Sequence, residues 1–475
     1  MSHQVTLIPG DGVGPEITTA VKKIIDASGA KIDWEICEAG AEVFKKGLAT
    51  GVPKETIDSI SKNKVALKGP LETPIGFGEK SANVTLRKLF ETYGNIRPIK
   101  EFPGVKTPYS GRNIDLVIVR ESVEDVYAGI EHMQNSSTGQ CLKLITRQGC
   151  ERIVRLAFEH ARAEGRKKVH CATKANIMKM TEGLLKRTFE EIATEYPEFE
   201  TGHVVVDNCA HQLVKKPEQF DVLVMTNMNG DVLSDLSSAL IGGLGFAPGV
   251  NYGDDVLIFE AVHGSAPKYA GKDVINPSAM LLSGMMMLRF LNEFKSADII
   301  EEALFYTLQE GKVMPRDVVG DEKGCKTSAF ANAIIENMGK KCDAWVGREY
   351  KSLNREVMKT LKAPVIQAEK LVGVDVFIEA SGDIAHFGDT ISAVAKTVGF
   401  ELKVVACRGS QVYPSTGTIP QLVPHLQCRF LKTGDMVDAD VITLLQALVP
   451  YHWMHVEKLR TFDEKKGFSK FQGEA

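Results

Sequence analysis

Short apolar runs that alternate with longer helical patterns constrain the fold of this chain more than any other feature. The helical patterns include residues 16–28, 151–164 and 177–195. The strand-like runs lie between or beside such patterns, at residues 5–8, 115–120, 168–172, 203–206, 221–225 and 256–261. This alternation is typical of an α/β fold in which helices cover a mainly parallel sheet. The chain of 475 residues is long enough for two or three domains of about 150 residues each.

Composition excludes several classes of protein. The 57 basic and 61 acidic side chains leave a net charge of −4, which argues against a surface that coats nucleic acid. No apolar run reaches the roughly 18 residues of a membrane span, and the N-terminus enters a strand pattern without the features of a signal peptide. Nine scattered cysteines without a C-x-x-C pair fit a reducing compartment. We therefore expect a soluble cytoplasmic protein that binds neither nucleic acid nor membrane.

A second pattern begins after a polar segment at about 346–364. Strand, helix and strand are predicted in that order, and the same order then repeats, at residues 374–379, 384–398, 402–407, 427–431, 439–448 and 452–458. This order is that of the split βαβ unit of ferredoxin-like domains. The sequence thus predicts a C-terminal α+β domain with a ferredoxin-like arrangement.

The glycines at positions 10, 12 and 14 follow the first predicted strand. They do not complete the G-x-G-x-x-G fingerprint of dinucleotide-binding folds. If Gly10 and Gly12 are its first two glycines, Pro15 occupies the position of the third, where the helix must pack closely against the strand. A tight turn between strand and helix is favoured over a phosphate site. We therefore do not expect a Rossmann fold.

Three arginines and two small polar residues suggest a pocket for a polycarboxylate. Ser81, Asn83 and Arg87 lie on one predicted helix, and Arg97 and Arg120 each end an apolar run. Guanidinium groups bind carboxylates through two parallel hydrogen bonds. The alternatives are that Ser81 only caps its helix and that the arginines are surface ion-pair partners.

Two aspartates stand one helical turn apart after a predicted strand. Asp231 and Asp235 would point the same way on a helix, and Asp207 after another strand would add a third carboxylate. Carboxylate oxygens are preferred ligands of Mg²⁺ and Mn²⁺. Favourable placement of the acids near a helix N-terminus explains the pair equally well.

A segment rich in small residues, 260–271, follows the last strand of the first pattern. Its backbone N–H groups can approach a phosphate closely. Lys268 and Tyr269 would hold the extra phosphate that distinguishes NADP from NAD, and the amide of Asn276 would read an adenine edge.

Together and in this order, these segments resemble the β-decarboxylating dehydrogenases, the isocitrate/isopropylmalate dehydrogenase family, over about residues 4–345. Residues 408–414 and 453–458 resemble the bacterial subgroup of NADP-type isocitrate enzymes with an extra C-terminal domain. The resemblance implies oxidative decarboxylation of isocitrate to 2-oxoglutarate and CO₂ in the tricarboxylic acid cycle. NADP is then the oxidant, Mg²⁺ or Mn²⁺ the metal, and a homodimer with shared active sites the minimum assembly, with a tetramer as the alternative.

The resemblance also implies roles for individual residues. Tyr127 and Lys174 would be catalytic, and Lys174 would serve the partner subunit's site together with Asp207. Substrate would be bound by Thr73, Ser81, Asn83, Arg87, Arg97, Arg120 and Asn176. The metal ligands would be Asp207, Asp231 and Asp235. The cofactor would contact Glu260, His263, Gly264, Ser265, Ala266, Lys268, Tyr269, Asn276, Arg316 and Asp317.

The same resemblance divides the chain into five parts. Residues 1–95 and 242–345 would form a large domain, and 96–241 a small domain that carries a dimer clasp. A linker at 346–364 would lead to the C-terminal domain at 365–475, whose role in subunit contact or stability stays open.

The sequence departs from its relatives at two positions. Ser122 stands where relatives often have asparagine, and Arg316 stands where some NADP enzymes place a tyrosine against the 2′-phosphate. An arginine there is expected to bind the same charge.

Three alternative functions remain. Ser81 and Asn83 oppose a homoisocitrate or isopropylmalate enzyme, and Lys268 and Tyr269 oppose NAD as the oxidant. The presence of the catalytic pair and of all three aspartates opposes a catalytically silent regulatory subunit.

Overall fold

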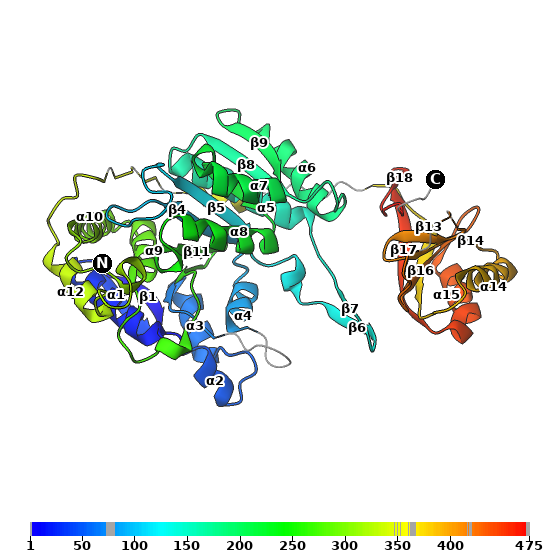
Figure 1. The fold of residues 1–475 in the computed structure, drawn as a ribbon, viewed down its shortest axis with the longest axis horizontal. Helices are drawn as coiled ribbons and strands as arrows, with labels where there is room; N and C mark the ends of the chain where they lie inside the picture. The colour runs from blue at the N-terminus through cyan, green and yellow to red at the C-terminus, as the bar shows by residue number, and fades with distance from the viewer. Residues whose placement is uncertain are drawn as a thin grey trace. The chain divides into compact units, whose positions relative to one another are not determined.

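A computed structural model describes residues 2–72, 81–345, 347–348, 350–351, 353–359, 361, 367–415, 417 and 420–471. The chain forms two compact units. The first holds Met1–Ala128 and Lys143–Leu361, and the second holds Gly129–Leu142 and Lys362–Ala475. Strands and helices alternate along both units, which confirms the predicted α/β class (Figure 1).

The first unit is built on a sheet of ten strands. Six neighbouring pairs are parallel and lie toward the two ends of the sheet. The strands across the sheet are β2 (Ile32–Ile36), β1 (His3–Ile8), β3 (Val65–Lys68), β12 (Leu257–Ala261), β11 (Pro248–Tyr252), β4 (Gly94–Lys100), β5 (Asp115–Glu121), β10 (Val222–Met225), β8 (Lys168–Thr173) and β9 (Glu200–Val205).

The middle of this sheet differs from the prediction. Three antiparallel pairs join β12, β11, β4 and β5, so the two parallel parts run in opposite directions. Strand β4 was not predicted because Asn95, Arg97 and Pro98 interrupt its apolar pattern. Asn95 and Arg97 are nevertheless buried, because polar side chains from other parts of the chain bind them there.

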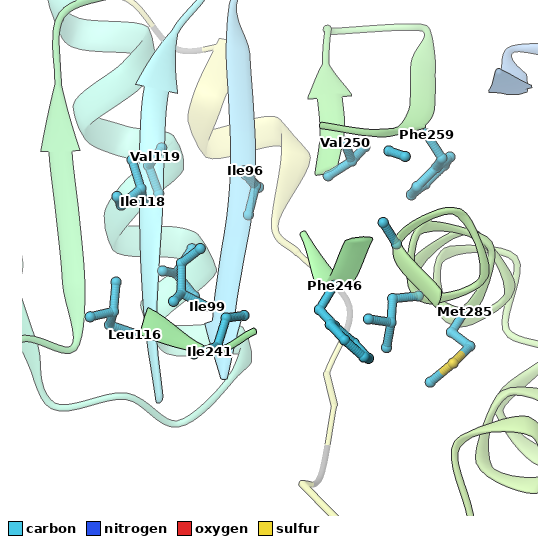
Figure 2. Close-up of a cluster of buried hydrophobic side chains, with 14 of the residues drawn as sticks. Ile96, Ile99, Leu116, Ile118, Val119, Ile241, Phe246, Val250, Phe259 and Met285 are labelled. Atoms are coloured by element: carbon cyan, nitrogen blue, oxygen red, sulfur yellow. The ribbon is translucent and has the colours of Figure 1, made fainter. Parts of the chain in front are cut away.

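Helices cover both faces of the sheet. α1 (Gly14–Ala27) is amphipathic, and Ile17, Val21 and Ile24 on its inner face are fully buried. Figure 2 shows part of the continuous core, where Ile96, Val250 and Phe259 lie on neighbouring strands and Met285 lies on α9 (Ser278–Phe290). The remaining helices of this unit are α2 (Ala41–Lys45), α3 (Lys54–Asn63), α4 (Ala82–Leu89), α5 (Arg147–Ala163), α6 (Thr181–Ala193), α7 (Val206–Lys215), α8 (Asn227–Leu240), α10 (Phe294–Glu310), α11 (Arg316–Val319), α12 (Thr327–Glu336) and α13 (Arg355–Lys359).

The expected helix at 177–195 begins later than predicted. The carbonyl of Lys174 accepts the N–H groups of Ile177 and Met178 at 3.0 and 2.9 Å, which closes a separate turn. Helix α6 starts only at Thr181. Lys174 therefore lies in a turn after β8 and not on a helix.

The second unit has the predicted ferredoxin-like order. Strands β14, β16, β13 and β17 lie side by side and antiparallel, and β15 (Ser410–Tyr413) and β18 (Lys465–Lys466) extend the two edges. The repeated elements are β13 (Glu369–Ile378), α14 (Ile384–Thr397), β14 (Glu401–Cys407), β16 (Leu426–Leu431), α15 (Asp438–Leu448) and β17 (Trp453–Phe462). This confirms the predicted C-terminal α+β fold.

A hairpin of β6 (Glu131–Asn135) and β7 (Thr138–Cys141) groups with this second unit. The side-chain amide of Asn135 donates to the carbonyl of Pro424 at 2.9 Å. Among the described residues, no helix is long and apolar enough to cross a membrane.

Candidate active site

A buried network joins α4 to the middle of the sheet. Arg87 on α4 donates from Nε to Oδ1 of Asn251 and from Nη2 to Oε1 of Glu260, each at 3.0 Å. The other carboxylate oxygen of Glu260 lies 2.6 Å from Nζ of Lys68 at the end of β3. Burial opposes ionisation of Glu260, but Lys68 and Arg87 outweigh it and hold the pKa of this carboxyl well below its usual range. Glu260 is therefore an anion that fixes two cations.

Arg97 continues the network on the same face of the sheet. Its Nε donates to Oδ1 of Asn95 at 2.6 Å, and its Nη1 donates to Oγ of Ser234 on α8 at 2.5 Å. Residues 95 and 97 share this face because side chains alternate along a strand. Burial lowers the pKa of Arg97, and nearby Asp231 and Asp235 oppose that shift.

Arg120, at the end of β5, contacts Asp231 directly. Its side chain is 1% exposed, and its Nη1 bonds Oδ1 of Asp231. The Nη2 group donates to Oδ1 of Asn227 at 2.7 Å. Gly230 allows this packing, because a Cβ there would lie 2.6 Å from Cγ of Arg120. The other carboxylate oxygen of Asp231 accepts the phenol of Tyr127 at 2.5 Å; Tyr127 lies in a short 3₁₀ turn at Val126–Ala128.

The two aspartates of α8 lie in different electrostatic surroundings. Burial opposes ionisation of Asp231, but Arg120 and Arg97 overcome it and lower its pKa. Burial raises the pKa of Asp235, and Arg97 and Arg120 offset only part of that shift. Burial and the hydrogen bond to Asp231 raise the pKa of Tyr127, so its phenol keeps its proton at neutral pH. The site thus presents carboxylate oxygens and a protonated phenol side by side.

Lys174 and Asp207 form a separate pair. Nζ of Lys174 lies 2.8 Å from Oδ1 of Asp207, and the two side chains are 30% and 67% exposed. Asp207, Asp231 and Asp235 do not form one cluster: within the described ranges, the chain holds no group of three acids or histidines arranged to bind a metal. A single chain therefore brings together two of the three predicted metal ligands.

The structure shows fewer contacts for the remaining predicted substrate residues. Ser81 is the N-cap residue of α4, and its carbonyl accepts the N–H of Thr85 at 2.9 Å, whereas its hydroxyl makes no capping bond. Asn83 donates to the carbonyl of Leu71 at 3.4 Å, and its buried Oδ1 has no partner in the described part of the chain. Asn176 is exposed in the turn after β8. Thr73 lies outside the described residues.

The early glycine turn supports the loop at 262–269. Gly12 has a φ of +59°, and a Cβ there would lie 2.0 Å from the carbonyl oxygen of Ser265. The N–H of Val13 donates to that same carbonyl at 2.9 Å. The N–H of Asp11 donates to Pro70, and its carboxylate accepts the N–H of Glu72 at 2.7 Å. The turn therefore holds neighbouring loops together, in agreement with the rejection of a dinucleotide fingerprint.

Three cations lie near the ring of Tyr269: Lys268, Arg316 and, at 5.7 Å from the centroid, Lys272. Nζ of Lys268 lies 5.2 Å from the ring centroid, and the guanidinium carbon of Arg316 lies 5.3 Å from it. Arg316 also pairs with exposed Asp321 at 2.6 Å. The amide of buried Asn276 donates to Asp317, the residue after Arg316, at 3.1 Å. Residues far apart in the chain thus form one basic surface with an aromatic ring in its middle.

A cavity of about 370 Å³ joins the arginine network to the loop. It is lined by Asn83, Arg87 and Arg97 on one side and by Glu260, His263, Gly264 and Ser265 on the other. Nε2 of His263 has no partner among the described residues, and burial lowers the pKa of this imidazole. The cavity offers cations and backbone N–H groups, a combination suited to a ligand with several negative charges.

Several supporting residues were not predicted as part of the site. Lys68, Asn95, Ser234 and Asn251 hold the arginines and Glu260 in place. Asn95 could have been predicted as a site residue, since it lies two positions before Arg97 on a strand and so shares its face. Asn251 could not have been predicted, because it contacts Asn95 and Arg87 only after distant strands pair.

Comparison with known proteins agrees with this architecture. Residues 4–334 match the family described as isocitrate/isopropylmalate dehydrogenase, and residues 369–474 match the C-terminal domain of bacterial isocitrate dehydrogenase. The chain is 58% identical to an NADP isocitrate dehydrogenase of Thermus thermophilus over 99% of this chain and 96% of the relative. It is 47% identical to a regulatory subunit of the mitochondrial NAD isocitrate dehydrogenase of Dictyostelium discoideum, over 71% of this chain and 94% of the relative.

The fold is also found in a solved structure. The crystal structure of the TT0538 protein of Thermus thermophilus superposes with a TM-score of 0.96 at 57% identity, covering 99% of this chain and 96% of the other. The chain therefore belongs to the isocitrate/isopropylmalate dehydrogenase family, in the bacterial subgroup that carries an additional C-terminal domain.

Proposed function

We propose that this protein is an NADP-dependent isocitrate dehydrogenase that converts isocitrate to 2-oxoglutarate and CO₂. The observation that carries the proposal is the cavity in which Asn83, Arg87 and Arg97 face the loop of His263. A tricarboxylate and a phosphate-bearing cofactor each find their preferred partners in this one space. The full-length relative from Thermus thermophilus, named for the same activity, supports it.

The arginine network suits isocitrate because it is held rigid before any ligand arrives. Arg87 and Arg97 are each anchored by neutral or anionic side chains, which fixes the direction of their free N–H groups. The buried amide oxygen of Asn83, without a partner in the described residues, is available for a hydroxyl or a protonated group of the substrate. An isopropylmalate enzyme needs an apolar surface here for an alkyl group, and Ser81 and Asn83 offer polar side chains.

The donor set of α8 fits a divalent cation. Asp231 and Asp235 offer carboxylate oxygens one helical turn apart, and oxygen donors are those that Mg²⁺ and Mn²⁺ prefer. Asp207 of the partner subunit would supply the third ligand. When bound, the cation polarises the carboxylate and hydroxyl oxygens of the substrate and so promotes both loss of the hydroxyl proton and loss of CO₂.

The loop and the basic surface at Tyr269 fit NADP. The backbone of residues 263–266 borders the cavity, and Lys268 and Arg316 flank the aromatic ring with two positive charges. A 2′-phosphate carries about two negative charges and favours such a pair, whereas NAD has only hydroxyls at this position. Asn276, held by Asp317, would orient its amide toward the adenine.

Two side chains would move the protons. Lys174 of the partner subunit would take the proton from the C2 hydroxyl of isocitrate, and NADP, when bound, would accept the hydride. Tyr127 would then donate its phenolic proton to the substrate carbon from which CO₂ has departed. The raised pKa of Tyr127 supports this role, because a phenol that stays protonated at neutral pH can act as an acid.

The separation of the two groups supports a homodimer with shared sites. Lys174 pairs with Asp207 away from Asp231 and Asp235 within one chain. Large apolar side chains near both groups are exposed, including Val232 on α8 at 61% and Ile177 after β8 at 70%. A second copy of the chain that covers them would bring the pair to the other site. Whether two such dimers associate into a tetramer, and whether the protein resides in the cytoplasm, stay predictions.

The main competing function is NAD-dependent isocitrate oxidation, because the Dictyostelium relative belongs to an NAD enzyme. That relative matches 71% of this chain, whereas the NADP relative of Thermus thermophilus matches 99%. The five-part division with boundaries at 95, 241, 345 and 364 also stays a proposal.

Initial rates of cofactor reduction test the function. The purified chain is assayed with isocitrate and Mn²⁺, with NADP or NAD, and with EDTA as the control. We expect rapid reduction of NADP that EDTA abolishes. Activity with NAD alone would overturn the cofactor assignment and leave the substrate site intact. Absence of activity with both cofactors would favour homoisocitrate or the silent regulatory role.

A further inference from the structure

A second cavity lies on the opposite face of the same sheet. It has a volume of about 330 Å³ and is lined by Ile96, Pro98 and Lys100 of β4 and by Val250 and Tyr252 of β11. The alternate residues of β4, Asn95 and Arg97, belong to the active-site network. Because side chains alternate along a strand, the two cavities share a backbone and have separate walls. Its size is at the lower end of the range for ligand pockets.

The walls of this cavity are largely apolar. Figure 2 shows Val250 and Phe259 on neighbouring strands, with Met285 on the helix beside them. Leu257, Leu282 and Phe290 also line it. None of these side chains takes part in the site proposed above. The body of a ligand that fits here would therefore be apolar.

One cation in the cavity is incompletely satisfied. The side chain of Lys100 is 28% exposed, and its nearest carboxylate oxygen among the described residues lies beyond hydrogen-bond distance. Its nearest acid, Asp115, is 3.7 Å away and already pairs with Arg166 at 3.0 Å and Arg348 at 2.8 Å. Lys100 also lies 3.7 Å from the ring centroid of Trp345. Burial lowers the pKa of Lys100, as expected for a cation with too few partners.

Two further polar groups lining the cavity are unsatisfied. The hydroxyl of Tyr252 and Nε1 of Trp345 are buried without a hydrogen-bond partner in the part of the chain that the structure describes. Tyr252 as a whole is 2% exposed. Buried donors without partners are costly, so they favour a ligand that accepts hydrogen bonds.

The acids near the cavity do not favour a cationic ligand. Glu164 pairs with Arg166 and Arg348 at 2.8 Å each, and Glu301 pairs with Arg289 at 3.0 Å. Lys351 and Arg355 at the edge have no carboxylate partner among the described residues; Arg355 donates to backbone carbonyls of Gly253 and Asp254. The charge left over is therefore positive.

We propose that this cavity is a second ligand site, which binds a small anion with an apolar body. The apolar part packs against Phe259, Met285 and Phe290, and the carboxylate or sulfonate binds the ammonium group of Lys100. The bound ligand would sit behind Asn95 and Arg97, so it would stiffen the strand that holds part of the active-site network.

The test uses two fluorescent probes that differ in one charged group. The first probe is 8-anilinonaphthalene-1-sulfonate, and the second is N-phenyl-1-naphthylamine, which lacks the sulfonate. Binding of each is titrated by fluorescence to the full chain in EDTA, so the reading does not depend on turnover. The variants are Lys100→Gln, Met286→Trp, whose larger side chain occupies cavity space, and Lys106→Gln as a matched control at an exposed lysine.

We expect the sulfonate probe to bind the wild type even with excess isocitrate and NADP. Lys100→Gln should weaken its binding by roughly tenfold or more, because a charge-assisted hydrogen bond is lost, and should change binding of the uncharged probe by less than about twofold. Met286→Trp should weaken both probes, and Lys106→Gln neither. The proposal is overturned if isocitrate or NADP displaces the probe, or if Lys100→Gln leaves the sulfonate probe unaffected. Should Met286→Trp fail to fold, the Lys100→Gln comparison still decides.

Discussion

Asp231 and Asp207 are both predicted metal ligands, yet their surroundings differ in almost every respect. Asp231 contacts buried Arg120, which is 1% exposed, and accepts the phenol of Tyr127. Asp207 is 67% exposed, and its one ion-pair partner among the described residues is Lys174 at 2.8 Å. The first group is completed by its own chain and the second is not. The difference teaches that folding of one chain fixes the surroundings of Asp231, whereas Asp207 lies where the proposed shared arrangement needs a second copy of the chain.

The largest expected effect comes from dividing the two parts between chains. Lys174→Gln and Asp231→Asn should each lower kcat by about 10²–10⁴, since one removes a proton acceptor and the other a metal ligand. Co-expressed, the two variants should form mixed dimers in which one site keeps both intact parts. The mixture should then recover about a quarter of the wild-type rate, because half of the dimers are mixed and each has one good site.

Initial rates on the co-purified mixture measure this recovery, and mixing the proteins after separate purification under non-exchanging conditions is the control. A mixture no more active than its parents would show that Lys174 and Asp231 act in the site of one chain, contrary to the shared arrangement.

The group around Asp231 should contribute more to the stability of the fold than the pair of Lys174 and Asp207. Arg120→Met removes the cation that bonds Asn227 and leaves Asp231 with its longer contact to Arg97 at 3.4 Å. The variant should lower the free energy of unfolding by roughly 3 kcal/mol, the low end of the range for breaking a buried pair. Lys174→Met, in the exposed pair, should leave the urea midpoint within error of wild type. Equal losses in both variants would show that the two groups are equally engaged in the single fold.

Glu121 is a buried carboxyl for which the described residues provide no cationic partner, so its contribution to stability depends on pH. Burial raises the pKa of Glu121 to about 7, and the N–H groups of Val123 and Glu124 oppose the shift only in part. Since the folded pKa is raised, the unfolded chain loses the proton first, and stability falls as pH rises from about 4.5 to 7.

Glu121→Gln removes this effect. The variant should gain on the order of 2 kcal/mol relative to wild type between pH 5.5 and 8.5, measured by urea unfolding at both values. Glu55→Gln at an exposed position is the control. A pH-independent difference for the Glu121 variant would mean that the buried carboxyl is already ionised below pH 5.5.

The smallest effect concerns Arg316, a partly buried cation that, like Lys174, has an acidic partner within the single chain. It pairs with exposed Asp321 and lies 5.3 Å from the ring of Tyr269. Arg316→Ala should raise the KM for NADP by about tenfold, since one charged contact to the 2′-phosphate is lost, and should spare NAD. Steady-state rates with both cofactors measure this, and an unchanged KM for NADP would exclude Arg316 from the phosphate site.

Much of the fold was predictable, because strands such as β5 and β10 are continuous apolar runs and helices such as α1 have a clear buried face. The ferredoxin-like order of the second unit was predictable for the same reason. Strand β4 was not, since Asn95 and Arg97 are polar and become buried only through partners on α8 and β11. Local pattern carries no information about such partners.

The site shows the same limit. Arg87, Arg97 and Arg120 stood out as residue types suited to carboxylates, and the structure brings them to one network with Asp231 and Glu260. Lys68 was missed, because a lysine at the end of an apolar strand gives no sign that Glu260, far along the chain, will neutralise it. The neighbour that makes burial of a charge tolerable is a property of the sheet order and not of the local sequence.

That sheet order has a consequence for synthesis of the chain. Strand β3 pairs with β12, so Val65 meets Leu257 only after most of the core has been made. Strands β4, β5, β10, β8 and β9 find all but one of their neighbours among themselves and can assemble earlier. During translation, the four buried residues of β3 therefore lack their β12 neighbour and leave an unpaired apolar edge while the middle of the protein folds. The ribosome-bound chain is then most exposed to aggregation, and most dependent on chaperones, before residue 257 emerges.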